Sequence, residues 1–270
     1  MPDIQDNRRD PAGIIRHLIS TPDLEVEYFA WGNPGKRPIL LLHGWPDCPL
    51  TWSHLAQALA ADNWWPIAPS LRGFGATRFK SPDIPRSGQF PALSRDAIGL
   101  LDALDIKDPI PVIGHDWGAR ASYVLSCLWP DRIRACVAMS VGWGTNRPDQ
   151  PLSMSQASRY WYHWFMHTAR GRQTVANNRR EFTRFLWQLW SPNWQFSDQE
   201  FAATAEFFDN PDWAEVTVHS YTHRWAGAPG DPAHQDLEQR LANAPLISVP
   251  TLMLHGDDDR VTEPSSSENR

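Results

Sequence analysis

The stretch PVIGHDWG, residues 111–118, decides the fold of this 270-residue chain. It begins as a short apolar run, typical of a strand buried on both faces of a parallel sheet, and a helix over residues 117–128 is predicted to follow. Gly114, Asp116 and Gly118 match the pattern G-x-nucleophile-x-G of a sharp strand-to-helix turn. The glycines are needed because a side chain at either position would collide with the neighbouring strand or helix. Asp116 is therefore the candidate nucleophile.

Asp116 also has a simpler interpretation, as the residue that caps the following helix. The surrounding loops favour the nucleophile. Glycine and polar residues follow three other predicted strands, at residues 43–46, 71–75 and 256–259. The carboxyl ends of parallel strands meet at one edge of a sheet, and folds of this kind build their sites there. The four loops are therefore expected to form one site.

Strands and helices alternate along the first half of the chain, and an apolar strand returns near its end. Strands are predicted at residues 24–31, 38–42, 65–68, 110–114, 133–140 and 250–254, and helices at residues 51–61, 94–104 and 117–128. This order implies an α/β fold in which helices cover both faces of a mostly parallel sheet.

The middle of the chain has a different character. Residues 142–244 contain no convincing strand pattern, and they hold eight of the fifteen Trp and seven of the eleven Phe residues. This composition predicts a helical lid inserted into the α/β core. The expected division is a first core segment at residues 1–141, a lid at residues 142–245 and a second core segment at residues 246–270.

Composition excludes several classes of function. The chain has 25 Lys and Arg against 31 Asp and Glu, a net charge of −6, so no basic stripe is expected and nucleic-acid binding is disfavoured. No run of about 20 apolar residues predicts a membrane span, and the first 20 residues lack the apolar segment of a signal peptide. Three cysteines without metal-site spacing fit a reducing, cytoplasmic location. The ligand spacing of a calcium loop is missing around residues 257–259, and no metal or cofactor is expected.

The four loops together resemble a known superfamily. The segments His43-Gly44-Trp45-Pro46, Arg72-Gly73-Phe74-Gly75, Gly114-His115-Asp116-Trp117-Gly118 and Gly256-x-x-Asp259 are similar to those of α/β-hydrolases, in the same order along essentially the whole chain. More narrowly, they resemble the branch that contains epoxide hydrolases and haloalkane dehalogenases, whose nucleophile is Asp. The resemblance implies the α/β-hydrolase fold, a small apolar substrate, and a monomer or homodimer.

The resemblance also implies a role for each matching residue. Asp116 would attack an sp³ carbon and form an alkyl-enzyme ester, which water activated by a His then hydrolyses. The backbone N–H groups of Trp45 and Trp117 would stabilise the oxyanion that forms on Asp116. Asp259 would orient the His. Substrate contacts are expected from four further residues: His43, Pro46, Trp161 and Phe165.

The leaving group separates the two activities of this branch. An alkoxide needs a proton, which Tyr162 and Tyr221 would supply in an epoxide hydrolase, with Tyr160 as a substitute. Simple packing within the lid is the alternative for each tyrosine. A halide needs only N–H donors, and Trp117 fits a dehalogenase as well. Trp45 stands where many dehalogenases have Asn, so the resemblance favours an epoxide hydrolase, with haloalkane dehalogenase as the alternative.

The catalytic His of this superfamily is missing from the expected place. It should follow Asp259 by a few tens of residues, but eleven residues follow and none is His. We expect a sequence truncated before the His loop; an inactive homologue, a non-catalytic binder of a small ligand, or another base are the alternatives. Adjacent side chains at such a turn diverge, so His115 is a poor base. The other candidates are expected to pack or to face solvent: His43, His219, His223 and His255.

Overall fold

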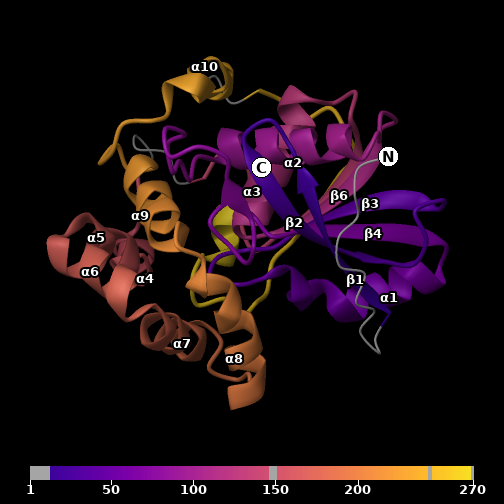
Figure 1. Cartoon of the computed structure of the whole chain (residues 1–270). Helices are drawn as coiled ribbons and strands as arrows, with labels where there is room; N and C mark the ends of the chain where they lie inside the picture. The colour runs from indigo at the N-terminus through magenta and orange to yellow at the C-terminus, as the bar shows by residue number, and fades with distance from the viewer. Residues whose placement is uncertain (1–12, 146–150, 243–244, 269–270) are drawn as a thin grey trace.

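The computed structural model describes residues 13–145, 151–242 and 245–268. Short parts of each predicted core segment and of the predicted lid therefore lie outside the described residues. One sheet of eight strands runs through the molecule (Figure 1). Its strands are β1 (Ile14–Ser20), β2 (Leu24–Trp31), β3 (Arg37–Leu42), β4 (Trp64–Pro69), β5 (Arg78–Phe79), β6 (Ile110–His115), β7 (Ile133–Met139) and β8 (Thr251–Leu254). The order is β1-β2-β4-β3-β6-β7-β8, with β5 paired to β2. The five strands β4, β3, β6, β7 and β8 are mutually parallel, which confirms the predicted α/β arrangement.

Three helices connect the parallel strands. They are α1 (Ser53–Ala61), α2 (Phe90–Ala103) and α3 (Trp117–Leu128), and Figure 1 shows α1 on one face of the sheet with α2 and α3 on the other. Right-handed crossover connections require helices on the faces of a parallel sheet, and the central strands are consequently buried on both sides.

All the regular elements that the structure describes between β7 and β8 are helices. Figure 1 shows its first six helices gathered beside the sheet, while α10 lies near α3. They are α4 (Met154–Arg159), α5 (Trp161–His167), α6 (Ala169–Asn177), α7 (Arg179–Trp190), α8 (Asp198–Ala205), α9 (Trp213–His223) and α10 (Gln235–Ala242). Short 3₁₀ turns complete the chain at Pro49–Trp52, Glu206–Asp209, Pro232–His234 and Pro264–Ser267.

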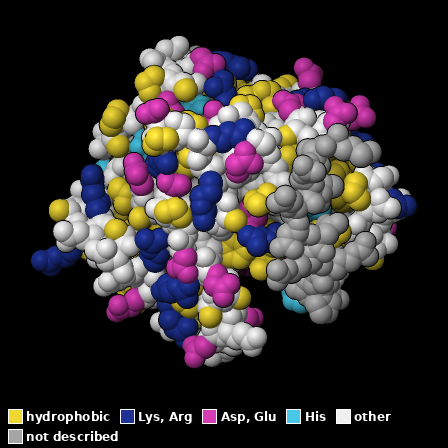
Figure 2. All heavy atoms as spheres, viewed as in Figure 1, with side chains coloured by type: hydrophobic (Ala, Val, Ile, Leu, Met, Phe, Trp, Pro, Cys, Tyr) yellow, Lys and Arg dark blue, Asp and Glu magenta, His cyan; other side chains and the backbone are white. Residues whose placement is uncertain are grey.

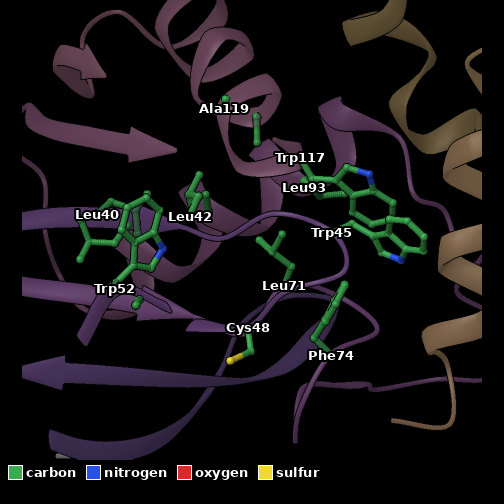
Figure 3. Close-up of a cluster of buried hydrophobic side chains, with 14 of the residues drawn as sticks. Leu40, Leu42, Trp45, Cys48, Trp52, Leu71, Phe74, Leu93, Trp117 and Ala119 are labelled. Atoms are coloured by element: carbon green, nitrogen blue, oxygen red, sulfur yellow. The ribbon is translucent and has the colours of Figure 1, made fainter. Parts of the chain in front are cut away.

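A continuous apolar core joins the sheet to these helices. Leu40, Leu42 and Val112 of the central strands are fully buried. Figure 3 shows the two leucines below α3, with Trp45 and Trp117 at the end of the cluster that faces the later helices. Removing such apolar side chains from water supplies the main stabilising free energy of a domain. It also fixes the loops that leave the carboxyl ends of the strands.

Three elements differ from the sequence prediction. Two strands were not predicted. β1 pairs antiparallel with β2 at the edge of the sheet, and its half-exposed residues show no clear pattern. β5 is only two residues long. Helix α2 begins at Phe90 rather than at residue 94, and Pro91 lies in its first turn. Proline is favoured there because the first turn leaves its backbone N–H groups unpaired.

The surface matches the balanced composition. On the face drawn in Figure 2, Lys and Arg side chains are interspersed with Asp and Glu, and no continuous basic stripe is visible. Within the described ranges, no helix has both the length and the apolar character that crossing a bilayer requires.

The turn between β6 and α3 depends on its second glycine. A Cβ on Gly118 would lie 2.0 Å from the carbonyl oxygen of Leu42, an overlap that only a backbone shift could relieve. We therefore expect Gly118→Ala to lower the free energy of unfolding by at least about 3 kcal/mol, measured by urea denaturation with tryptophan fluorescence.

Gly99→Ala is the matched control, because Gly99 also lies within a helix and its added Cβ would meet only ordinary contacts at 3.5 Å. Alanine has the higher helix propensity, so Gly99→Ala should leave stability unchanged or raise it by up to about 1 kcal/mol. Equal effects of the two substitutions would contradict the close packing of this turn.

Candidate active site

Asp116 occupies the strained turn between β6 and α3. Its φ of 50° is rare for a residue with a side chain, and such strain is typical of functional positions. Its backbone N–H donates to the carbonyl of Met139 at 3.2 Å, which ties the turn to β7. Its side chain makes no capping hydrogen bond to α3, so the simple helix-cap interpretation is not supported.

The Asp116 carboxylate instead accepts a hydrogen bond from the loop after β3. The backbone N–H of Trp45 donates to Oδ1 of Asp116 at 2.8 Å. The preceding glycine permits this approach, because a Cβ on Gly44 would lie 2.8 Å from Cβ of Asp116. The backbone N–H of Trp45 thus contacts the carboxylate that it is expected to stabilise, and its role as an oxyanion donor stays a prediction. Trp117, the other predicted donor, is fully buried at the first position of α3.

The indole N–H groups of these two tryptophans already have partners. Nε1 of Trp45 donates to the hydroxyl of Thr217 at 2.9 Å. Nε1 of Trp117 donates to the hydroxyl of Tyr221 at 3.2 Å. Thr217 was not predicted, because only the folded arrangement of α9 brings it to Trp45.

Two predicted tyrosines lie together beside the turn. Tyr162 of α5 and Tyr221 of α9 are buried, and their ring centroids are 5.3 Å apart. Burial raises the pKa of each phenol well above its ordinary value, and the negative charge of Asp116 acts in the same direction. Both hydroxyls therefore stay protonated at neutral pH. Tyr160, the substitute, has its hydroxyl 3.3 Å from Thr262.

A cavity of about 620 Å³ opens beside Asp116, and we call it the Asp116 cavity. Its lining includes Trp45, Tyr162 and Asp259, so four predicted site residues meet at one place. Indole rings of the α7–α8 region form part of its wall, which suits an apolar molecule. They are Trp190 and Trp194. These two residues were not predicted, although their aromatic segment at residues 187–196 was a usable signal.

The remaining predicted residues do not line the Asp116 cavity. The hydroxyl of Tyr221 is hydrogen-bonded to Trp117, and Trp161 lines a separate surface hollow. Three further residues are buried or partly buried outside the cavity lining: His43, Pro46 and Phe165. Their predicted contact with substrate stays a prediction.

Asp259 is held in place by the chain that follows it. Its Oδ1 accepts hydrogen bonds from the backbone N–H groups of Val261 at 2.7 Å and Thr262 at 3.0 Å. Its Oδ2 lies 3.2 Å from Nε2 of His255. The side chain that Asp259 contacts is thus His255.

The histidines near the site have different environments. Nε2 of His43 accepts a hydrogen bond from the backbone N–H of Leu71 at 3.1 Å, and burial lowers the pKa of His43 to about 3. Nδ1 of His255 lies 2.8 Å from the hydroxyl of Ser267. Both therefore belong to packed structure, as expected. His115 lines the Asp116 cavity.

The other predicted histidines lie away from Asp116. Nδ1 of His219 accepts a hydrogen bond from the backbone N–H of Gly88 at 3.0 Å, and His223 stacks on His219. Within the described part of the chain, no group of three or more His, Cys, Asp or Glu side chains could hold a metal ion. The groups that the structure brings together at the site are a carboxylate, phenols and a backbone N–H group.

This chain is similar to a known family and to several known proteins. The sequence model of the family described as alpha/beta hydrolase fold matches residues 37–269. Epoxide hydrolase 2 of Siraitia grosvenorii is 38% identical over 128 residues, which cover 47% of this chain and 39% of that protein. Epoxide hydrolase A of Mycobacterium tuberculosis is 30% identical over 148 residues, which cover 55% and 45%. The match thus spans less than half the length of these curated relatives.

A solved structure extends the likeness over nearly the whole chain. The crystal structure of a presumed epoxide hydrolase from Klebsiella pneumoniae superposes with a TM-score of 0.88 at 36% identity. The superposition covers 96% of this chain and 87% of the other.

Proposed function

We propose an epoxide hydrolase function for this chain, which belongs to the alpha/beta hydrolase fold family. The names of the similar proteins support this choice over other hydrolases of the fold. The main observation behind this proposal is the Asp116 cavity. The Asp116 carboxylate, which accepts the N–H of Trp45, and the protonated phenol of Tyr162 both line it.

The first chemical step opens the epoxide. A carboxylate oxygen of Asp116 attacks a ring carbon, a new C–O bond forms, and the ring C–O bond breaks with its electron pair on oxygen. Tyr162, with Tyr221 next to it, donates a proton to that oxygen. The product is a hydroxyalkyl ester of Asp116.

The second step hydrolyses the ester. Water attacks the Asp116 carboxyl carbon, the resulting oxyanion is stabilised by the N–H groups of Trp45 and Trp117, and the diol leaves as the carboxylate re-forms. One proton of the water ends on the departing alkoxide and completes the diol, and the other replaces the one that tyrosine gave. This step needs a base, which the family supplies as a His oriented by an acid, here Asp259. Among the histidines described, His255 contacts Asp259 but does not line the cavity, and its other ring nitrogen lies beside Ser267. His43 is held by Leu71, and His115 alone of the described histidines lines the cavity. In this chain we therefore expect the ester to form faster than it is hydrolysed.

The hydrogen bonds of the Trp45 and Trp117 indoles favour an epoxide over a haloalkane as the substrate. Both indole N–H groups are occupied, by Thr217 and Tyr221, and so neither is free to bind a halide. We expect styrene oxide to give its diol or a protein adduct, followed by chromatography and mass spectrometry. With 1-bromohexane, bromide release should not exceed that of the Asp116→Asn variant. Bromide release well above that background, without reaction of the epoxide, would favour the dehalogenase.

Several wider properties belong to the same proposal. The aromatic wall of the cavity suits a small apolar substrate. Three free cysteines fit a cytoplasmic location, and the balanced surface charge gives no support to nucleic-acid binding. We propose a monomer or homodimer, with residues 142–245 acting as a lid over a core built from the segments on either side.

A further inference from the structure

A second and larger cavity lies between α2, α3, α10 and the end of α9. Its volume is about 830 Å³, within the range of small-molecule sites. The apolar part of its lining comes from α2, α3, α10 and the segment after β7, and includes Phe90, Tyr123 and Trp143. Arg120 of α3 and Arg224, directly after α9, also line it, and we call it the Arg120–Arg224 cavity.

Both arginines are more than nine-tenths buried, with 7% and 8% of their surfaces exposed. Arg120 donates to the carbonyl and hydroxyl of Thr145 at 3.0 and 3.1 Å, and its Nε has no hydrogen-bond partner among the residues that the structure describes. Arg224 donates to the carbonyl and hydroxyl of Ser220, each at 3.2 Å. Among the described residues, no carboxylate lies within ion-pair distance of either guanidinium.

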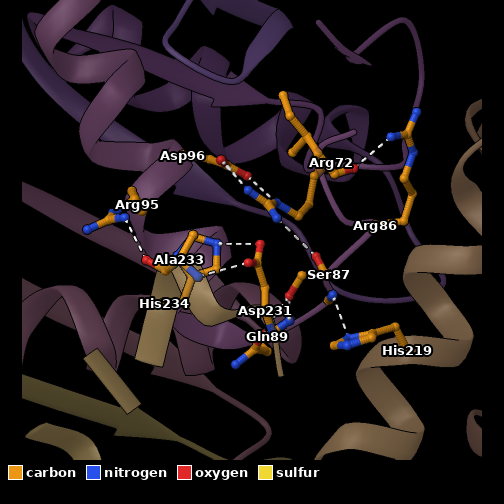
Figure 4. A network of polar contacts seen from close by, with 12 residues as sticks. Arg72, Arg86, Ser87, Gln89, Arg95, Asp96, His219, Asp231, Ala233 and His234 are labelled. Atoms are coloured by element: carbon orange, nitrogen blue, oxygen red, sulfur yellow. Dashed lines mark hydrogen bonds and ion pairs between the residues drawn. The ribbon is translucent and has the colours of Figure 1, made fainter. Parts of the chain in front are cut away.

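A nearby arginine shows how this chain otherwise holds a buried positive charge. Arg72 is more deeply buried still, with 1% of its surface exposed, and its guanidinium makes a bidentate ion pair with Asp96 at 2.6 and 2.7 Å (Figure 4). Burying a guanidinium without an anion is costly, because the charge loses its hydration and gains no equivalent. Arg120 and Arg224 therefore lack the partner that Arg72 has.

Other charged groups near the cavity do not replace that partner. The two guanidiniums both face the ring of Phe90, at 5.5 and 5.0 Å, and burial together with the charge of Arg224 lowers the pKa of Arg120. Asp116 acts on Arg120 more weakly, from the neighbouring site. Glu238 also lines the cavity, but its carboxylate is held by the side-chain amide of Gln89 at 2.6 Å.

We propose that the Arg120–Arg224 cavity is a second binding site, separate from the Asp116 cavity, for an organic carboxylate with an apolar chain or ring. The carboxylate would receive charge-assisted hydrogen bonds from the two guanidiniums, whose planar N–H groups match its geometry. The apolar part would lie against Tyr123 and Trp143. The proposal does not depend on epoxide chemistry.

The test compares octanoate with octanamide, which has the same chain without the charge, by isothermal titration calorimetry. The Asp116→Asn protein is titrated as well as the original chain, so that reaction at Asp116 plays no part. We expect octanoate to bind at least about tenfold more tightly than octanamide, and Arg120→Met or Arg224→Met to weaken octanoate at least about tenfold.

Arg95→Met is the matched control, because Arg95 also carries a positive charge near this cavity, on α2, but is exposed and donates to the carbonyl of Ala233 (Figure 4). It should leave octanoate binding unchanged. Equal binding of octanoate and octanamide to the original chain would overturn the proposal, whether or not the variants fold. So would the absence of octanoate binding, or an equal loss in Arg95→Met.

Discussion

Asp116→Asn is expected to lower the rate of reaction with styrene oxide by at least about 10³-fold. The amide is a far weaker nucleophile than the carboxylate. Its oxygen can still accept the N–H of Trp45, so the turn should keep its structure. The rate is measured as epoxide consumed per protein, by chromatography, under single-turnover conditions.

Asp257→Asn is the control for this substitution, since Asp257 is an exposed acid in the loop that also carries Asp259. It removes the same charge without touching the cavity, and its rate should stay within about twofold of the original. A rate that survives in Asp116→Asn would mean that another residue or direct attack by water opens the epoxide.

The double substitution of Tyr162 and Tyr221 by Phe is expected to slow epoxide opening by about 10²- to 10⁴-fold, the usual contribution of a general acid. Each single variant should lose less, because the two phenols lie beside each other. Tyr28→Phe is the control, a buried tyrosine on β2 away from the cavity. An unchanged rate in the double variant would contradict the proton-donor role and mean that the two tyrosines only pack within the lid.

The pH dependence of the opening step follows from the same phenols. Burial raises the pKa of both, and the protonated form is the one that donates. Activity should therefore be present below the raised pKa and be lost only as pH rises through it. We expect no decline of the single-turnover rate up to about pH 10, the ordinary tyrosine value. A decline between pH 8 and pH 10 would contradict the assignment.

Much of the fold could be predicted because its signals are local. Helix α3 begins and ends at the predicted residues 117 and 128, since a glycine-bounded turn and an apolar strand directly precede it. β1 could not be predicted, because its stability comes from pairing with β2 rather than from its own half-exposed side chains. The position of β5, two residues long, depends on β2 in the same way.

The site could be predicted in part. Trp45, Asp116 and Asp259 follow strand ends, and the parallel sheet brings such ends together; the resemblance added Tyr162. The distances among lid helices could not be predicted, so Thr217 was missed as the partner of Trp45. The Arg120–Arg224 cavity was missed for the same reason: its two arginines lie about a hundred residues apart, and neither carries a motif.

The identity of the attacking atom is tested most directly by mass spectrometry of the tryptic peptide DPIPVIGHDWGAR, residues 108–120. The chain is treated with styrene oxide in water enriched in ¹⁸O, quenched, digested and fragmented. We expect either a hydroxyalkyl ester on Asp116 or, after turnover, ¹⁸O in the Asp116 carboxylate. Modification confined to His115 or Asp108, or a diol that carries the label from its first turnover while Asp116 stays unlabelled, would contradict it.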